Sequence, residues 1–225
     1  MINEVQYRAR IVFGLLLVFA AMGGVLFGAA GRWDVPMFWA YLGTITAIFS
    51  FFSMRADPEL MKERRKPGPG GKDHGLRWNA TLVWVTSLIV AGLDVGRFHW
   101  SDSVPIWLQI PALALIVAGL SLAGWASRTN RFHSSVARIQ RDRGHHVVTS
   151  GPYQYLRHPT YAAAMMWFPL TAVALGSWWA LLPALLAVPL FLRRLFIEEG
   201  MLFAELEGYT EYAAKVPYRI LPGVW

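Results

Sequence analysis

The sequence contains no cysteine and few charged residues. Without cysteine there are no disulfides, no thiolate metal ligands and no thiol nucleophile. Charged residues make up 16% of the 225 residues, against about 25% in an ordinary soluble domain, and 55% are hydrophobic. Eleven tryptophans and thirteen phenylalanines are too many to hide in one soluble core of this size. The composition therefore argues against a water-soluble enzyme and predicts that lipid surrounds much of the chain.

Long stretches without a charged side chain locate the expected membrane spans. A helix needs about 20 apolar residues to cross the hydrocarbon core, and four uncharged stretches are near that length. The third of them is shorter and is expected to continue to the region of Arg97. These stretches cover residues 11–31, 35–54, 78–93 and 103–127. A signal peptide is the alternative for the first, but its apolar run exceeds the roughly 7–15 residues of such signals.

A fifth uncharged stretch, residues 158–192, has 35 residues and is too long for one span. Gly176 and Ser177 divide it, so we predict two short helices of about 17 residues each that form a hairpin. Three prolines are expected to bend these helices, namely Pro169, Pro183 and Pro189. The sequence therefore predicts an all-α, polytopic transmembrane protein with about six spans, including a C-terminal hairpin.

Lysine and arginine fall almost entirely on one side of these spans. With the N-terminus inside, nineteen of the twenty-one lie in cytoplasmic segments, and only Arg32 and Arg97 do not. We therefore expect a multi-pass integral membrane protein with both termini, and any site in the basic segments, in the cytoplasm. Residues 1–127 would hold four spans and a basic loop at 55–77, and residues 128–225 a cytoplasmic loop, the hairpin and a C-terminal cytoplasmic tail. Topology and contact with membrane lipids account for the net charge of +7, so we expect no nucleic-acid partner.

Two features resemble known binding sites but fail on spacing. The Gly- and Pro-rich stretch from Lys66 to Lys72 lacks the residues that a Walker A or a dinucleotide-binding loop requires. We interpret it as a flexible basic connector. The six histidines include the adjacent pair His145 and His146, but none of them form a His-x-x-His or similar metal-binding spacing. We therefore expect no catalytic metal.

Polar residues collect just before the predicted hairpin. A Gly-Pro turn precedes them, and Pro159 is well placed as the first residue of the next helix. Free backbone N–H groups at a helix start attract anions, so an anionic group of a ligand is expected beside Arg157 and His158. The alternative is an interfacial anchor of tyrosine and arginine side chains at headgroup level.

A second polar cluster follows the hairpin. Arg194 and Glu198 are one helical turn apart on one face. Because both ends of the hairpin are expected on the same side of the membrane, this pair should meet the polar residues that precede the hairpin. Ionisable groups at a membrane boundary indicate a functional site. A purely structural ion pair between Arg194 and Glu198 is the alternative.

Several motifs occur together in the C-terminal third of the chain. Thr-Ser-Gly-Pro-Tyr precedes Arg-His-Pro-Thr-Tyr at 157–161, and Glu198-Glu199 and Tyr209-x-x-Tyr212 follow the hairpin. This combination, over residues 145–225, resembles the isoprenylcysteine carboxyl methyltransferase family, whose superfamily includes phospholipid and thiol methyltransferases. The resemblance implies a membrane methyltransferase that uses S-adenosylmethionine near the cytoplasmic face. Its acceptor would be a lipophilic small molecule or a lipid that enters from the bilayer.

The resemblance also implies roles for single residues. Arg194 would bind and orient the acceptor. The expected catalytic residues are Arg194, His158 and Glu198. A further family position before His145 corresponds to Arg138 or Gln140. The expected cofactor-binding residues are His145, His146, Val147, Val148, Tyr153, Arg157, His158, Pro159, Thr160, Tyr161, Glu198 and Glu199.

Two other classes of protein are compatible with the sequence. Sterol reductases, which bind NADPH, resemble this superfamily in their C-terminal hairpin but are usually much longer. A non-catalytic scaffold or transporter is the second class, and the helix-packing spacing Gly24-x-x-x-Gly28 fits a scaffold. Methyl transfer from an already activated sulfonium needs alignment and no protein nucleophile, so the lack of cysteine does not oppose it. Carboxylate, thiol and amine acceptors all stay open, as does the oligomeric state.

Overall fold

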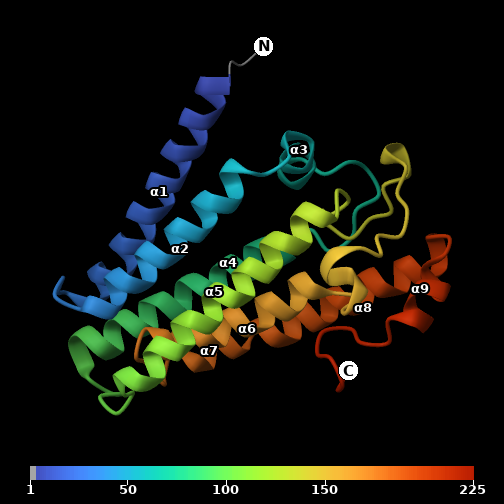
Figure 1. Ribbon diagram of the computed structural model, residues 1–225. Coiled ribbons are helices and arrows are strands. Elements are labelled where there is room, and N and C mark those ends of the chain that lie inside the picture. Colours follow the sequence, from blue (N-terminus) through green and yellow to red (C-terminus); the bar gives the residue numbers. More distant parts are fainter. Residues whose placement is uncertain (1–3) are drawn as a thin grey trace. The chain divides into compact units, whose positions relative to one another are not determined.

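Helices dominate the fold (Figure 1). The computed structural model describes residues 4–225, with side chains from residue 11 onward, so the predicted cytoplasmic segment 1–10 lies outside the described side chains. The elements are α1 (Glu4–Ala30), α2 (Pro36–Met54), α3 (Pro58–Arg65), α4 (Leu76–Gly92), η1 (Leu93–Phe98), α5 (Ile106–Thr129), η2 (Arg141–Arg143), η3 (Gly151–Gln154), α6 (Pro159–Ala174), α7 (Leu181–Leu185), α8 (Ala187–Glu205) and α9 (Tyr209–Lys215).

Within residues 4–225, four helical stretches are long and apolar enough to cross a membrane. They are Ile11–Ala30, Pro36–Met54, Leu76–Phe98 and Ile106–Thr129, and each matches one of the first four predicted spans. The third continues from α4 into the π-helical turn η1, which confirms its predicted extension to the region of Arg97. The chain is therefore an all-α integral membrane protein.

The fifth uncharged stretch forms two helices with a break between them. α6 begins at Pro159, as predicted, and ends at Ala174; the chain then turns at Gly176, whose φ of +82° favours glycine. The return helix is interrupted at Leu186, between α7 and α8. Pro189 explains this break, because it lacks the N–H that would bond the carbonyl of residue 185 and its ring crowds that carbonyl.

The chain forms two compact units, each made of three separate segments. The first contains the chain up to Arg55 together with residues 81–118 and 167–186, and the second contains residues 56–80, 119–166 and 187–225. The sequence analysis divided the chain once, between residues 127 and 128, whereas the segments of these two units alternate along the sequence. All residues that the sequence indicated for the site lie in the second unit.

Small residues and one buried carboxylate organise the first unit. α1 packs on α2 and on η1 (Figure 1). A Cβ added at Gly92 would lie 2.5 Å from the carbonyl oxygen of Leu26, whereas one at Gly24 would meet nothing within 4 Å. The close helix packing therefore uses Gly92 rather than the Gly24 spacing. Asp94 is fully buried and accepts bonds from the backbone N–H of Ser101 (2.8 Å) and the Ser177 hydroxyl (2.5 Å), which ties two turns together.

The basic loop at 55–77 contains the short helix α3 and one backbone bridge. Asp57 caps α3 by accepting a bond from the Glu59 N–H (2.7 Å). Lys72 forms an isolated antiparallel bridge with Ala137. The loop therefore belongs to the packed part of the second unit.

Candidate functional site

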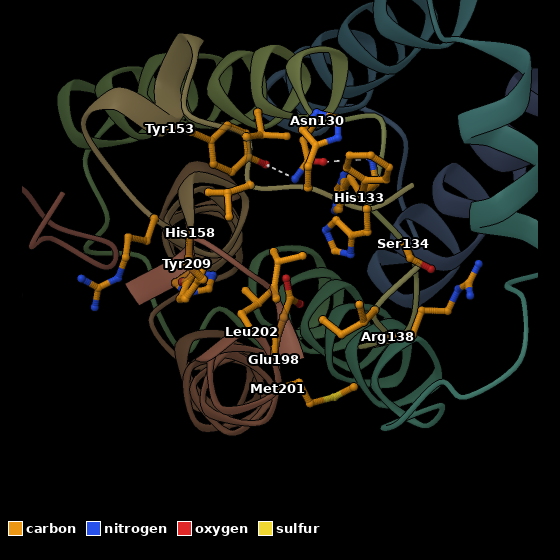
Figure 2. A pocket seen from close by; sticks show the side chains of 18 of the residues that line it. Asn130, His133, Ser134, Arg138, Tyr153, His158, Glu198, Met201, Leu202 and Tyr209 are labelled. Carbon is orange, nitrogen blue, oxygen red and sulfur yellow. Dashed lines mark hydrogen bonds between the residues drawn. The ribbon is translucent and has the colours of Figure 1, made fainter. Parts of the chain in front are cut away.

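A pocket opens in the second unit, between α8 and the loops that precede η3 (Figure 2). It encloses about 800 Å³, part of which is open to solvent. Glu198, Met201 and Leu202 line it together because positions i, i+3 and i+4 share one face of α8. Figure 2 shows Glu198 and Leu202 facing Asn130 and Tyr153 across the pocket.

The pocket collects most of the residues that the sequence indicated for the cofactor. Ten of the twelve line it, while Pro159 and Glu199 do not. The ten are His145, His146, Val147, Val148, Tyr153, Arg157, His158, Thr160, Tyr161 and Glu198. The expected meeting of the segments before and after the hairpin is therefore realised in the second unit.

Arg194 lies behind the pocket wall and reaches it through Tyr161. Its side chain is 2% exposed, and its Nε donates to the Tyr161 hydroxyl at 3.2 Å. That hydroxyl donates in turn to Glu198 at 2.5 Å, and the direct distance from Arg194 Nε to Glu198 Oε2 is 3.7 Å. The Glu198 side chain keeps 34% of its surface exposed. The pair predicted from its spacing is thus bridged by a tyrosine, and its carboxylate remains accessible to a ligand.

Glu199 does not line the pocket; its carboxylate binds Arg157 and Arg219 instead. Its side chain is 5% exposed; Oε1 accepts from Arg157 Nε at 2.8 Å and Oε2 from Arg219 Nε at 2.6 Å. His158 Nε2 lies 3.5 Å from Oε1, longer than an ordinary hydrogen bond. Burial raises the pKa of Glu199, but His158, Arg219 and Arg157 outweigh it and bring the pKa to about 2. Glu199 is therefore an ionised anchor for Arg157 and His158.

The C-terminal segment supports the same anchor from the other side. Arg157 Nη1 donates to the carbonyls of Val216 and Pro217, each at 3.0 Å. The backbone N–H groups of Arg157 and His158 donate to the carbonyls of Tyr218 (2.9 Å) and Arg219 (2.8 Å). These contacts hold the start of α6, and with it His158 and Tyr161, in a fixed position.

Arg138 and Gln140, the two candidates for the family position before His145, lie in different surroundings. Arg138 lines the pocket, and its guanidinium binds the Glu63 carboxylate (2.8 Å) and Asp142 (2.9 Å), which raise its pKa. Gln140 is fully buried and donates to the carbonyl of Phe132, so it shapes the loop from within. Of the two, only Arg138 lies at the pocket.

Two histidines at the pocket are held neutral by their surroundings. Burial, reinforced by the charges of Arg64 and Arg194, lowers the pKa of His133 to about 3. Burial also lowers the pKa of His145 to about 4. His133 Nδ1 is 2.8 Å from the Ser127 hydroxyl, which orients the ring. At neutral pH both imidazoles are uncharged hydrogen-bonding groups.

Sequence reasoning missed a further set of pocket residues. Asn130 donates to the Tyr153 hydroxyl at 3.3 Å (Figure 2), and His133 follows it by three residues. Tyr209 and Tyr212, also three apart, line the pocket from α9, which lies beside α8 (Figure 1). The Tyr209-x-x-Tyr212 motif was part of the resemblance, and its spacing indicates a shared helix face, but no place in the pocket was predicted for either tyrosine.

Comparison with known proteins gives matches in the same region and over the whole fold. Residues 107–205 match the family model described as phospholipid methyltransferase. The chain is 32% identical to protein-S-isoprenylcysteine O-methyltransferase B of Arabidopsis thaliana over 123 residues, 53% of this chain and 59% of that protein. It is 31% identical to the Schizosaccharomyces pombe protein-S-isoprenylcysteine O-methyltransferase over 112 residues, 48% of each chain. The chain thus spans about half to three fifths of the length of these curated relatives.

A solved structure extends the likeness to the fold. The eukaryotic intramembrane Ras methyltransferase, an isoprenylcysteine carboxyl methyltransferase, superposes with a TM-score of 0.63 at 20% identity, covering 99% of this chain and 88% of that one. At this identity the match concerns the fold. In sequence the chain resembles the isoprenylcysteine carboxyl methyltransferases, as its motifs predicted, and in part the phospholipid methyltransferases; in fold it resembles the solved isoprenylcysteine carboxyl methyltransferase.

Proposed function

We propose that this protein is a membrane methyltransferase that transfers a methyl group from S-adenosylmethionine to a lipophilic acceptor. The named relatives and the phospholipid methyltransferase match support the reaction class. The observation that carries the proposal is the single pocket wall on which Glu198, Tyr161 and His158 come together with Arg194 directly behind it.

The pocket residues fit the proposed cofactor. S-adenosylmethionine combines a cationic sulfonium, a carboxylate, an amine and an apolar adenine face. The accessible Glu198 carboxylate suits a cationic group, and Leu202, Val147 and Val148 provide apolar contact. The Tyr209 hydroxyl is buried without a hydrogen-bond partner, so it is available to a polar ligand atom.

The protein's own residues would supply alignment and exclusion of water. The bound cofactor carries an activated methyl group, so no residue has to act as a nucleophile. Arg194, fixed by Tyr161, would orient the acceptor, and Arg157 and His158 would hold the cofactor from the start of α6. Pro159 would set this start, and Glu199 would keep Arg157 and His158 in place. An acceptor with an anionic head suits Arg194; the prenylcysteine carboxylate implied by the relatives' names is such a group.

Binding and turnover of purified protein test this proposal. In detergent, the protein should bind S-adenosylhomocysteine in calorimetry, and Glu198→Gln should weaken that binding. Arg194→Lys should lower methyl transfer to a prenylated cysteine, a thiol or a lipid extract while largely keeping the binding. Tight NADPH binding without any response to the adenosyl ligand would favour the reductase class and overturn the proposal.

We further propose that both termini and the pocket face the cytoplasm. The absence of cysteine makes this testable without removing native thiols. A single cysteine at exposed Asp102, in the loop before α5, should react with an impermeant maleimide from outside intact cells, and one at exposed Glu207 should react only after permeabilisation. The reverse labelling pattern would refute the orientation.

A further inference from the structure

Residues 66–75, which we call the strap, pack against the pocket loops of the second unit. Lys72 and Ala137 exchange backbone hydrogen bonds of 2.8 and 3.2 Å. The carbonyl of Pro69 accepts from Arg138 Nη1 at 3.4 Å. The His74 ring bonds the carbonyl of Gly71 at 2.9 Å, which closes the strap on itself. The strap therefore has a defined path, fixed by backbone groups.

Two glycines allow this close approach. A Cβ at Gly71 would lie 2.5 Å from Cγ2 of Val136, and one at Gly68 would lie 2.6 Å from Nη2 of Arg138. Both neighbours line the pocket. Larger residues at these two positions would push the strap away from the pocket loops.

The end of the strap holds Arg194. Nη1 of Arg194 donates to the carbonyls of Lys72 (3.1 Å) and Asp73 (3.3 Å), while Nε donates to Tyr161. A buried arginine with a long, flexible side chain needs such partners to keep one rotamer. The strap carbonyls fix the side of the guanidinium that faces away from Tyr161.

The backbone conformation of Asp73 orients the carbonyls of Lys72 and Asp73. Asp73 is in the left-handed conformation, with φ of +58°, which aspartate and asparagine tolerate better than other non-glycine residues. Its side chain is 6% exposed, and Oδ1 accepts from Arg193 Nη1 at 2.9 Å. Oδ2 is buried without a hydrogen-bond partner, 4.0 Å from Arg194 Nη1. Asp73 thus joins the strap to α8 at two successive arginines.

We propose that Asp73 is a positioning residue for Arg194: by fixing the strap, it holds the guanidinium beside Tyr161 and Glu198 and so sets the rate of methyl transfer. This inference rests on the proposed function, in which Arg194 orients the acceptor. Asp73 does not line the pocket, so its effect should fall on turnover of the acceptor and not on binding of the adenosyl ligand.

A double-mutant cycle tests the link between Asp73 and Arg194. Asp73→Ala loses the carboxylate and disfavours the left-handed backbone, whereas Asp73→Asn keeps an acceptor for Arg193 and tolerates that backbone. Methyl transfer is measured with whichever of a prenylated cysteine, a thiol or a lipid extract the wild type methylates. Calorimetry with S-adenosylhomocysteine and thermal unfolding are measured on the same samples. Asp57→Ala, which removes the cap of α3, serves as the control.

We expect Asp73→Ala to lower kcat/KM for the acceptor about tenfold, since small misplacements of aligning groups are costly. Affinity for S-adenosylhomocysteine should change less than twofold, and Asp73→Asn should retain most of the turnover. In the Arg194→Lys background, Asp73→Ala should have little further effect, because lysine has no fork to be held by the two carbonyls.

Three outcomes would overturn the inference. The first is an equal loss from Asp73→Ala with Arg194 present or replaced, which would mean that Asp73 acts independently. The second is a parallel loss of turnover and of adenosyl-ligand binding. The third is an equal loss of turnover from Asp57→Ala, which would indicate general destabilisation. A wild-type protein that neither binds the adenosyl ligand nor methylates any acceptor would instead refute the proposed function on which the inference rests.

Discussion

Replacing Glu199 by glutamine should destabilise the second unit strongly. The side chain is 5% exposed and bonds Arg157 and Arg219 through separate oxygens. Its pKa of about 2 lies about 2.5 below the usual 4.5, which at about 1.4 kcal/mol per pH unit corresponds to about 3 kcal/mol at neutral pH. Breaking a buried ion pair by removing one partner typically costs about 3–5 kcal/mol, which agrees. We therefore expect Glu199→Gln to lose about 3 kcal/mol.

The stabilisation by ionised Glu199 should depend on pH in a defined direction. Because folding depresses the pKa of Glu199, its stabilisation is fully present above about pH 4.5 and is lost as the pH falls toward 2. The stability of the wild type should therefore decline through this window more steeply than that of Glu199→Gln. The difference between the two proteins should be largest near neutral pH and shrink on acidification.

Unfolding in detergent, followed by tryptophan fluorescence at several pH values, measures both effects. Glu205→Gln on the same helix α8 is the matched control, because Glu205 pairs with Arg141 in an exposed contact of 3.3 Å. Such exposed pairs contribute about 1 kcal/mol or less. If Glu199→Gln costs no more than Glu205→Gln, or if its pH profile coincides with that of the wild type, the anchoring role assigned to Glu199 is wrong.

Three further predictions concern other parts of the fold. Asp94→Ala removes the acceptor of two buried hydrogen bonds and should cost about 3 kcal/mol in thermal unfolding; a change below 1 kcal/mol would contradict its role in joining two turns. Gly92→Ala should cost about 1–3 kcal/mol because the added Cβ would meet the backbone of α1 at Leu26. Gly24→Ala places its Cβ in open space and should be neutral or stabilising, so equal effects of the two substitutions would refute the packing argument. Glu63→Gln should weaken S-adenosylhomocysteine binding in calorimetry by loosening Arg138; unchanged affinity would show that the Glu63 contact does not position that arginine for the ligand.

The sequence alone determined where the long apolar helices lie and that the two ends of the hairpin meet. Uncharged stretches indicate spans because a charge in hydrocarbon is costly, so their ends can be read to within a few residues. The start of α6 at Pro159 follows from the preference of proline for the first turn. The encounter of Tyr161 with Arg194 and Glu198 follows from the hairpin, which returns the chain to the side from which it left.

Only the tertiary structure separated residues that look alike in sequence. Glu198 and Glu199 are neighbours, but successive residues on a helix point about 100° apart, so one reaches the pocket and the other the cluster around Arg157. Arg138 and Glu63 are 75 residues apart, and the strap meets Arg194 across more than 120. Contacts over such separations depend on how whole segments pack, which no local pattern encodes. The scarce charges thus located the site, and packing decided which of them face a ligand and which hold the others in place.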